Sequence, residues 1–266
     1  MDESEYLGRV RALWARAWPA DTPCEPHYPI GRVPLTDHLR HWARTTPDKP
    51  ALHFYGHDTT FAQLDDMSDR FAALLAQRGI GTGDRVAVFL SNCPQFNAVF
   101  FGILKLGAVY VPISPLSQRV ELMHALTDAT PRAIVVLDRL MPLVRDIRAE
   151  TSLEHVFVTH YADVVPAQPT LPLPPMLTEP PLACGDAIDL LSALASTTPI
   201  DLPPASLDAI AALNYTGGTT GLPKGCIHTQ GDMVDMAAAF SAVSLRMDTD
   251  TVMLSFYPQF WIAGEN

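Results

Sequence analysis

The sequence predicts an α/β protein with mainly parallel sheets flanked by helices. Four short apolar runs between residues 85 and 159 alternate with helical patterns. Apolar strands joined by crossover helices form parallel sheets that are covered on both faces. The composition agrees, because 48% of the 266 residues are apolar and 18% are charged, whereas disordered chains are rich in charge and poor in apolar residues.

Residues 1–33 are predicted to form an N-terminal helix and a lead-in segment. Apolar side chains recur at helical spacing in Tyr6–Trp18, and three arginines occupy the other faces. We expect this helix to dock on the body of the protein. The alternative is a helix that lies on a membrane surface, for which three arginines are few.

Residues 34–162 are predicted to form a first α/β subdomain. Thr60 and Gln63 make a capping box, Ser117 is a second candidate helix cap, and Gly79 suits a helix end. The expected helices are Leu35–Arg44, the helix that Thr60 begins, Pro94–Leu106, the helix from Ser117 to Asp128, and Arg139–Glu150. The expected strands are Ala51–Tyr55, Arg85–Leu90, Val109–Ile113, Ala133–Leu137 and His155–Thr159.

Residues 163–205 are predicted to be a proline-rich loop region. Seven prolines lie between residues 163 and 182. Proline lacks a backbone donor and fixes φ, so a surface loop is expected, and a polyproline docking motif is the alternative. Residues 206–266 are expected to start a second α/β portion. Its elements are a strand over Asp208–Tyr215, a helix over Gln230–Leu245 and a strand over Thr251–Phe256.

Charge and cysteine content argue against several classes of protein. The net charge of −11 disfavours a nucleic-acid partner, which would need a large basic patch. The four cysteines lack zinc-ligand spacing, so reduced thiols in a cytoplasmic protein are expected. The acidic N-terminus does not resemble a signal peptide. The apolar stretch 98–113 contains Lys105 and is too short to span a membrane, so no transmembrane segment is expected.

The segment Tyr215–Gly225 carries the strongest functional signal, because it reads Tyr-Thr-Gly-Gly-Thr-Thr-Gly-Leu-Pro-Lys-Gly. Its glycines let the backbone approach a ligand and turn N–H groups toward it. The threonines add hydroxyl donors, and Lys224 adds a positive charge suited to phosphate. It differs from a Walker A loop because Pro223 precedes the lysine. We predict a polyphosphate-binding loop, and a tight structural turn is the alternative.

This segment resembles the AMP-binding signature of the adenylate-forming ligases, the superfamily of acyl-CoA synthetases, firefly luciferase and peptide-synthetase adenylation domains. The usual signature has Ser where this chain has Gly217, a change that fatty acyl-CoA ligases often share. Gly83–Val88 resembles the Gly-Asp-Arg-Val strand of the family, and Leu104–Ala108 resembles its Leu-Lys-x-Gly-Ala motif. The resemblance runs from about Leu35 to the last residue and is strongest to fatty acyl-CoA synthetases.

The resemblance implies a reaction and the residues that serve it. A carboxylic acid, here a fatty acid, attacks the α-phosphorus of ATP to give an acyl-adenylate and pyrophosphate, and coenzyme A then accepts the acyl group. Mg²⁺ assists, and Thr216 is the candidate metal ligand. The implied ATP- and phosphate-binding residues are Thr216, Gly217, Gly218, Thr219, Thr220, Gly221 and Lys224.

A second motif, Pro258–Gly264, matches the Pro-x-Phe-His-x-x-Gly of the family, which borders the acyl pocket. Phe260, Trp261 and Gly264 are therefore candidate acyl-pocket residues. Trp261 replaces the usual His, and its large ring would gate or shorten the acyl tunnel. Peptide-synthetase domains usually have Phe-Asp here, so an amino-acid substrate is not expected. The alternative is that both aromatic residues belong to the core.

Later segments of the family supply adenine, Mg²⁺ and ribose contacts and a C-terminal domain with a catalytic lysine. The resemblance implies that these other catalytic residues lie beyond Asn266, the last residue of this sequence. A Thr-Gly-Asp occurs at residues 82–84, but it precedes a strand and is interpreted as a turn. The chain resembles part of the N-terminal domain of the acyl-CoA synthetase fold, and we expect it to be inactive alone.

The alternative to such a partial ligase is a short, non-catalytic protein that binds a nucleotide or a partner. Oligomer formation and peripheral membrane contact are left open by the sequence.

Overall fold

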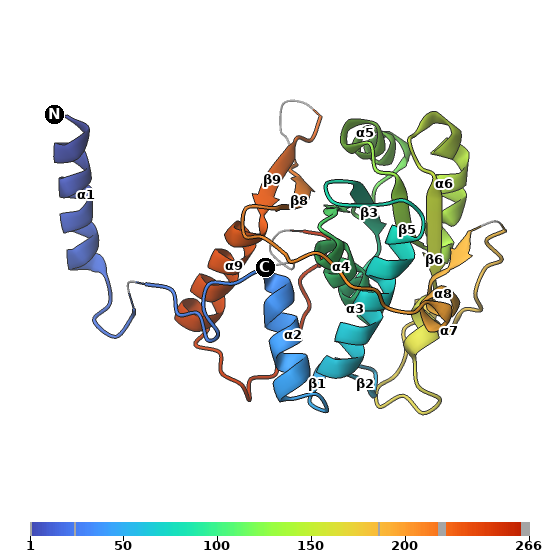
Figure 1. The fold of residues 1–266 in the computed structure, drawn as a ribbon, viewed down its shortest axis with the longest axis horizontal. Helices are drawn as coiled ribbons and strands as arrows, with labels where there is room; N and C mark the ends of the chain where they lie inside the picture. Colours follow the sequence, from blue (N-terminus) through green and yellow to red (C-terminus); the bar gives the residue numbers. More distant parts are fainter. Residues whose placement is uncertain (1, 24, 186, 218–221, 262–266) are drawn as a thin grey trace.

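The computed structural model describes residues 2–23, 25–185, 187–217 and 222–261. Its centre is a sheet with strand order β7-β6-β5-β3-β4-β8-β9, in which β9 is antiparallel to β8 and the other neighbours are parallel (Figure 1). The predicted α/β class is confirmed. The strands are β1 Pro50–Phe54, β2 His57–Thr60, β3 Arg85–Phe89, β4 Val109–Pro112, β5 Ala133–Leu137, β6 His155–Thr159, β7 Ile188–Asp189, β8 Ile210–Tyr215 and β9 Gly225–Thr229.

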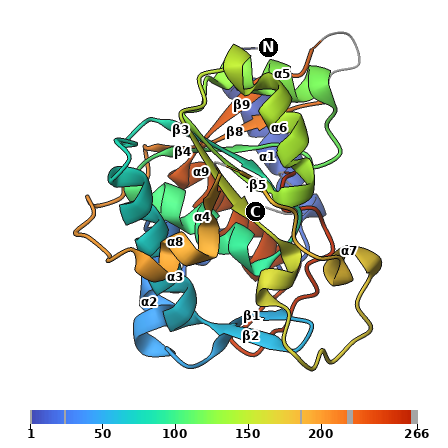
Figure 2. The ribbon, with the colours of Figure 1, turned by 90° about the vertical axis from the view of Figure 1, so that its right-hand side faces the viewer.

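Helices cover both faces of this sheet (Figure 2). Side chains of β3 alternate between the two faces, so Val86 and Val88 join the core under α3, α4 and α8, whereas Ala87 and Phe89 join the core under α5 and α6. The helices are α1 Glu3–Ala17, α2 Leu35–Thr45, α3 Phe61–Ala76, α4 Pro94–Leu106, α5 Arg119–Ala129, α6 Met141–Ile147, α7 Pro175–Thr178, α8 Leu190–Ser196 and α9 Gln230–Ala237.

Two of the three predicted helix signals are confirmed. The Thr60 hydroxyl accepts from the Gln63 N–H at 3.2 Å, and the Gln63 side chain accepts from the Thr60 N–H at 2.8 Å. Gly79 follows α3 with φ +74°, a conformation that glycine adopts without strain. The prediction that Ser117 caps a helix is wrong. Ser117 closes a turn with the Ser114 carbonyl, and Gln118 is the cap residue of α5.

The strand predicted over Thr251–Phe256 is also wrong. Its apolar side chains are mostly exposed, and Val252 is 93% exposed. No other strand of the described residues pairs with this segment. The helix expected over Gln230–Leu245 is confirmed as α9, which continues as a π-helix over Ala238–Ser244. A short run of apolar residues alone therefore did not identify a strand here.

α1 forms as predicted but does not dock. None of its residues is buried, Trp14 is 65% exposed, and the helix stands away from the body (Figure 1). The chain is instead held by its lead-in, where Arg32 donates twice to the Asp235 carboxylate of α9 at 2.8 Å. The docking prediction is therefore wrong, and the alternative of contact with a membrane surface stays open. None of the described helices is both long enough and apolar enough to cross a membrane.

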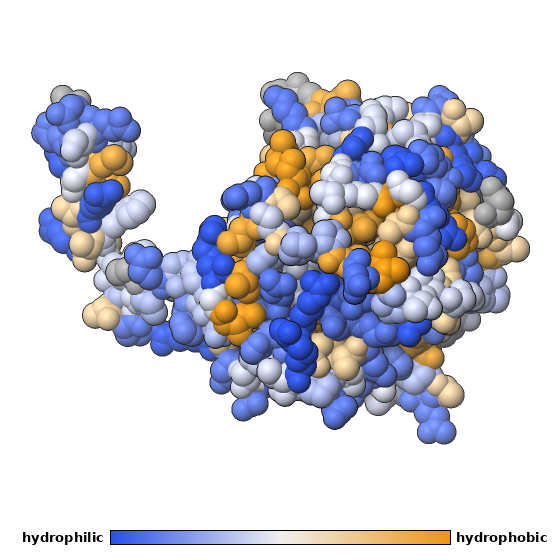
Figure 3. Space-filling view, viewed as in Figure 1, coloured by the Kyte–Doolittle hydropathy of each residue, from blue (hydrophilic) through white to orange (hydrophobic). Residues whose placement is uncertain are grey.

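The proline-rich region is mostly loop, as predicted, with the short elements α7, β7 and α8 inside it. β8 and β9 then extend the same sheet that β3 to β6 begin. The division of the chain at residues 33, 162 and 205 therefore stays a proposal. Exposed apolar side chains gather over β9 and α9 (Figure 3), among them Ile227 and Met236.

A buried lysine joins α3 to α4. Lys105 is 1% exposed, and its ammonium group donates to the Asp65 carboxylate at 2.5 Å, the Asp69 carboxylate at 2.7 Å and the Asp65 carbonyl at 2.9 Å. These contacts use all three ammonium donors. A buried ammonium without such partners would be strongly destabilising.

Candidate functional site

The predicted phosphate loop connects β8 to β9. The antiparallel register pairs Tyr215 with Gly225, and the Thr216 N–H donates to the Lys224 carbonyl at 3.0 Å. This hydrogen bond joins the two ends of the loop at the end of the hairpin. Gly218, Thr219, Thr220 and Gly221 lie outside the described residues. Thr216, Gly217 and Lys224 are exposed, so the described part of the loop is open to a ligand.

The described part of the loop has the donors that a phosphate requires. A Cβ built at Gly217 would meet no atom within 4 Å, so a ligand can approach the backbone there. Lys224 adds an exposed ammonium group to the loop. β8 runs parallel to β4, and the loop follows its carboxyl end, which is where open α/β sheets bind ligands. The sequence did not predict that β9 would return antiparallel to β8.

Thr216 is compatible with the metal role expected from sequence. Its hydroxyl donates to the Lys224 carbonyl at 3.4 Å, which leaves oxygen lone pairs for a hard cation. Within the described ranges no three His, Cys, Asp or Glu residues form a metal-binding group. A Mg²⁺ ion at Thr216 would therefore need its other ligands from phosphate oxygens and water, as Mg²⁺ commonly does.

Two residues of α5 contact the base of this loop. The Tyr215 hydroxyl donates to the Asp128 carboxylate at 2.6 Å, and the His124 Nε2 lies 2.7 Å from the Pro223 carbonyl oxygen. The His124 ring meets the Tyr215 ring edge to face, with centroids 5.9 Å apart. Burial, together with the Asp128 carboxylate, raises the pKa of Tyr215 above its usual value. Sequence reasoning missed both α5 residues, and their spacing of four was the available signal.

The second motif lies beside the carboxyl end of β3. Phe260 packs against the core of the α3–α4 face, whereas Trp261 is 53% exposed and contacts Phe260 edge to face. The two aromatic residues therefore differ, because one supports the core and the other is available to a ligand. Gly264 and Asn266 lie outside the described residues. The expectation that the other catalytic residues lie beyond Asn266 therefore stays a prediction.

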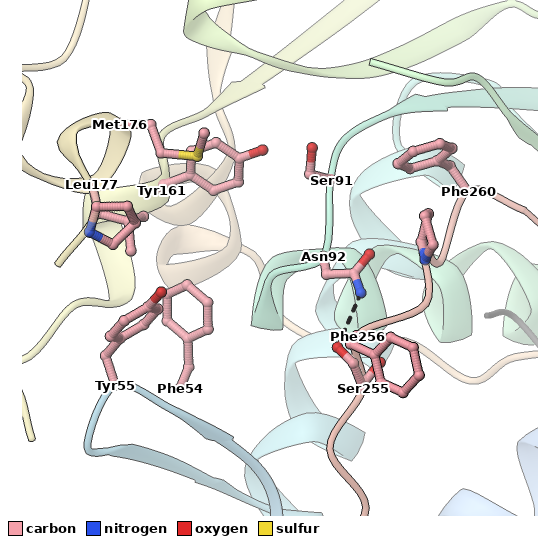
Figure 4. Close-up of a pocket in the computed structure, with 12 residues that line it drawn as sticks. Phe54, Tyr55, Ser91, Asn92, Tyr161, Met176, Leu177, Ser255, Phe256 and Phe260 are labelled. Atoms are coloured by element: carbon pink, nitrogen blue, oxygen red, sulfur yellow. Dashed lines mark hydrogen bonds between the residues drawn. The ribbon is translucent and has the colours of Figure 1, made fainter. Parts of the chain in front are cut away.

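Asn92 holds the chain that leads into this motif. Its amide nitrogen donates to the Tyr257 carbonyl at 2.7 Å, and its amide oxygen accepts from the Gln259 N–H at 2.8 Å. The same nitrogen donates to the Ser255 carbonyl at 3.3 Å, the bond drawn in Figure 4. Sequence reasoning missed this residue. One side chain after β3 thus replaces the pairing that a neighbouring strand would provide for residues 255–259.

A cavity of about 360 Å³ opens next to this motif. Figure 4 shows aromatic side chains from three parts of the chain around it, with polar groups from the loop after β3. Burial raises the pKa of Tyr161 to about 12, so its phenol is neutral at physiological pH. The lining residues are Phe54, Tyr55, Ser91, Asn92, Tyr161, Pro174, Met176, Leu177, Ser255, Phe256, Pro258 and Phe260. Phe260 lines this cavity and Trp261 does not.

Comparison with known proteins decides the family. The profile of the AMP-binding enzymes matches residues 39–265. This chain belongs to the AMP-binding enzyme family. The family match covers both motifs that sequence analysis singled out, and the resemblance to adenylate-forming ligases is confirmed.

Among the relatives of this AMP-binding chain is the long-chain-fatty-acid–CoA ligase of Salmonella typhimurium. It is 31% identical over 233 residues, which cover 85% of this chain and 41% of that ligase. The chain thus spans less than half the length of this curated relative.

Solved structures show the same fold. A putative long-chain-fatty-acid CoA ligase from Rhodopseudomonas palustris matches with a TM-score of 0.74 at 21% identity, over 87% of this chain and 53% of that one. The anthranilate CoA ligase AuaEII, solved in complex with anthranoyl-AMP, matches with a TM-score of 0.63 at 26% identity, over 75% of this chain and 35% of that one. The architecture therefore corresponds to part of an acyl-CoA ligase.

Proposed function

We propose that the full-length protein activates a carboxylic acid, foremost a fatty acid, with ATP and transfers the acyl group to coenzyme A. The observation that carries the proposal is the Gly-Thr-Lys loop that follows the carboxyl end of β8 in a chain of the AMP-binding family. The long-chain-fatty-acid ligase relative and the ligase solved with an acyl-adenylate support it.

In this proposal the loop binds the leaving pyrophosphate. Backbone N–H groups beside Gly217, the threonine hydroxyls and Lys224 would stabilise the negative charge that grows on phosphate oxygens. Mg²⁺, when bound, supplies further positive charge, and Thr216 would be its protein ligand. Phe260 and Trp261 would border the acyl chain of the acid.

The test is acid-dependent exchange between ATP and pyrophosphate in the full-length protein. We expect exchange with fatty acids that exceeds exchange with aryl acids and amino acids. ATP binding without acid-dependent exchange for any member of such a panel would favour the alternative, a non-catalytic nucleotide-binding protein. Coenzyme A should then release AMP and acyl-CoA from the preformed adenylate.

We also propose that residues 1–266 alone do not complete this reaction. The resemblance assigns the adenine, ribose and lysine contacts to later segments, and the matched region covers 41% of the Salmonella relative. We expect no measurable exchange from the 266-residue chain assayed beside the full-length protein. Robust acid-dependent exchange by the 266-residue chain would contradict this proposal.

Replacing Trp261 by alanine is expected to change which acids are used. The Trp261 ring packs edge to face against Phe260, which lines the cavity, so its removal loosens this wall and makes room for a longer acyl chain without touching the phosphate loop. In the full-length protein the acid preference should move to longer chains, whereas the KM for ATP should stay the same. Trp14→Ala, which removes another exposed indole on α1, is the matched control. An effect of Trp261→Ala on the KM for ATP alone would contradict this assignment.

A further inference from the structure

We propose that His124 and Asp128 are positioning residues that fix both ends of the phosphate loop for nucleotide binding. The proposal rests on the function proposed above. The two side chains lie four residues apart on α5, so they project from the same face of the helix. One contacts the residue before Lys224 and the other contacts the residue before Thr216.

The direction of each hydrogen bond follows from its partners. The Pro223 carbonyl can only accept, and it lies 2.7 Å from the His124 Nε2, so this nitrogen carries the hydrogen and donates. The Tyr215 hydroxyl donates to the Asp128 carboxylate at 2.6 Å, a short charge-assisted bond. Proline has no N–H, so the carbonyl is the only backbone group through which position 223 can be held.

The two contacts and one backbone bond form a closed frame. The Thr216 N–H donates to the Lys224 carbonyl at 3.0 Å and ties the two ends of the loop to each other. His124 and Asp128 then tie these ends to α5. That helix is itself rigid, because Leu122 and Leu126 are fully buried in the core beneath it.

These contacts affect nucleotide binding because the loop is rich in glycine. Glycine-rich backbone loses more conformational entropy than other backbone when it becomes ordered. Fixing both ends in advance reduces the entropy that nucleotide binding must remove, which increases affinity without a new contact to the ligand. A purely structural role for His124 would change stability but would not change the KM for ATP selectively.

The experiment compares His124→Ala with His124→Gln in the full-length protein. Glutamine places an N–H at about the reach of Nε2 and should preserve the bond to Pro223, whereas alanine removes it. Hydrogen exchange of the peptide covering residues 216–224, followed by mass spectrometry without ligand, reports loop order. Steady-state release of pyrophosphate reports the KM for ATP and for the acid.

We expect His124→Ala to speed exchange in residues 216–224 and to raise the KM for ATP roughly tenfold, the cost of about one hydrogen bond. The KM for the acid should not change, and His124→Gln should restore both properties. Tyr215→Phe removes only the hydroxyl that donates to the Asp128 carboxylate, and it should reproduce the effect if His124→Ala fails to fold. Thr127→Ala is the control, because among the described residues this exposed hydroxyl bonds to carbonyls of α5 alone.

Two results would overturn the proposal. One is unchanged exchange in residues 216–224 when His124 is alanine or Tyr215 is phenylalanine. The other is faster exchange with no change in the KM for ATP, or no recovery with glutamine. If the unmodified protein releases no pyrophosphate, the proposed function fails. The exchange measurement then decides separately whether His124 and Asp128 order the loop.

Discussion

Replacing Lys224 by alanine in the full-length protein is expected to slow acyl-adenylate formation about a hundredfold and to leave the KM for the acid nearly unchanged. Lys224 and the loop threonines face the departing pyrophosphate in the proposed reaction, while the acid approaches the α-phosphorus from elsewhere. Their contacts strengthen as charge moves onto the leaving group, which is the condition for raising the rate rather than affinity alone. Losing one such donor typically costs about 3 kcal/mol.

The measurement is steady-state pyrophosphate release with ATP and acid varied separately. Thr220→Ala should act in the same direction as Lys224→Ala. The chain offers a matched control among its three lysines. Lys49 is exposed and donates to the Thr249 carbonyl, far along the chain from the loop, so Lys49→Ala should leave the rate unchanged. If Lys224→Ala changed only the KM for the acid, the assignment of Lys224 to the phosphate-binding loop would be wrong.

Replacing Lys105 by methionine is expected to lower the free energy of unfolding by about 3 kcal/mol. The substitution keeps the length of the side chain but removes the charge that neutralises Asp65 and Asp69. Breaking a buried ion pair from one side is strongly destabilising, because the opposite charge loses its partner. Asp65 would lose the Lys105 ammonium group, whereas Asp69 would keep a longer contact with Arg40 at 3.7 Å. The two carboxylates are about a quarter exposed, so water compensates part of the loss.

Chemical denaturation of the variant and the unmodified protein measures this effect. Asp66→Asn is the control, because Asp66 is on the same helix and pairs with Arg70 at 2.6 Å at the surface. Exposed ion pairs of this kind contribute little to stability. Equal unfolding midpoints for Lys105→Met and Asp66→Asn would show that the buried ammonium does not stabilise the α3–α4 pair.

The sequence predicted the parts of the fold that local patterns determine. β5 and β6 lie where their apolar runs place them, and the Thr60 capping box forms as expected. The predictions that failed depend on contacts between segments far apart in the sequence. The apolar side chains of Thr251–Phe256 have no neighbouring strand among the described residues, and the amphipathic face of α1 has no surface to cover. Neither fact is encoded within the segment concerned.

The candidate site likewise combines residues that local sequence identifies with residues that only the tertiary fold reveals. The residues of the phosphate loop follow from composition, because glycine, threonine and lysine have properties that suit phosphate. The roles of His124, Asp128 and Asn92 could not be predicted, because each side chain binds a backbone group or hydroxyl that only the tertiary fold brings near; the spacing of His124 and Asp128 shows only that they share a helix face. Their partners at Pro223, Tyr215 and residues 255–259 lie 87 or more positions along the chain.

The strand order sets the distance between the two predicted parts of the site, the phosphate loop and the aromatic motif. Asn92 follows β3 and holds the segment that leads into the aromatic motif, whereas the phosphate loop follows β8. β4 alone lies between these strands, so the two strand ends are separated by two strand spacings, roughly 10 Å. Backbone hydrogen bonds determine this distance. In the proposed reaction, substitutions that reshape the cavity beside the aromatic motif would therefore change which acid is used without altering the distance between the acid carboxylate and the nucleotide.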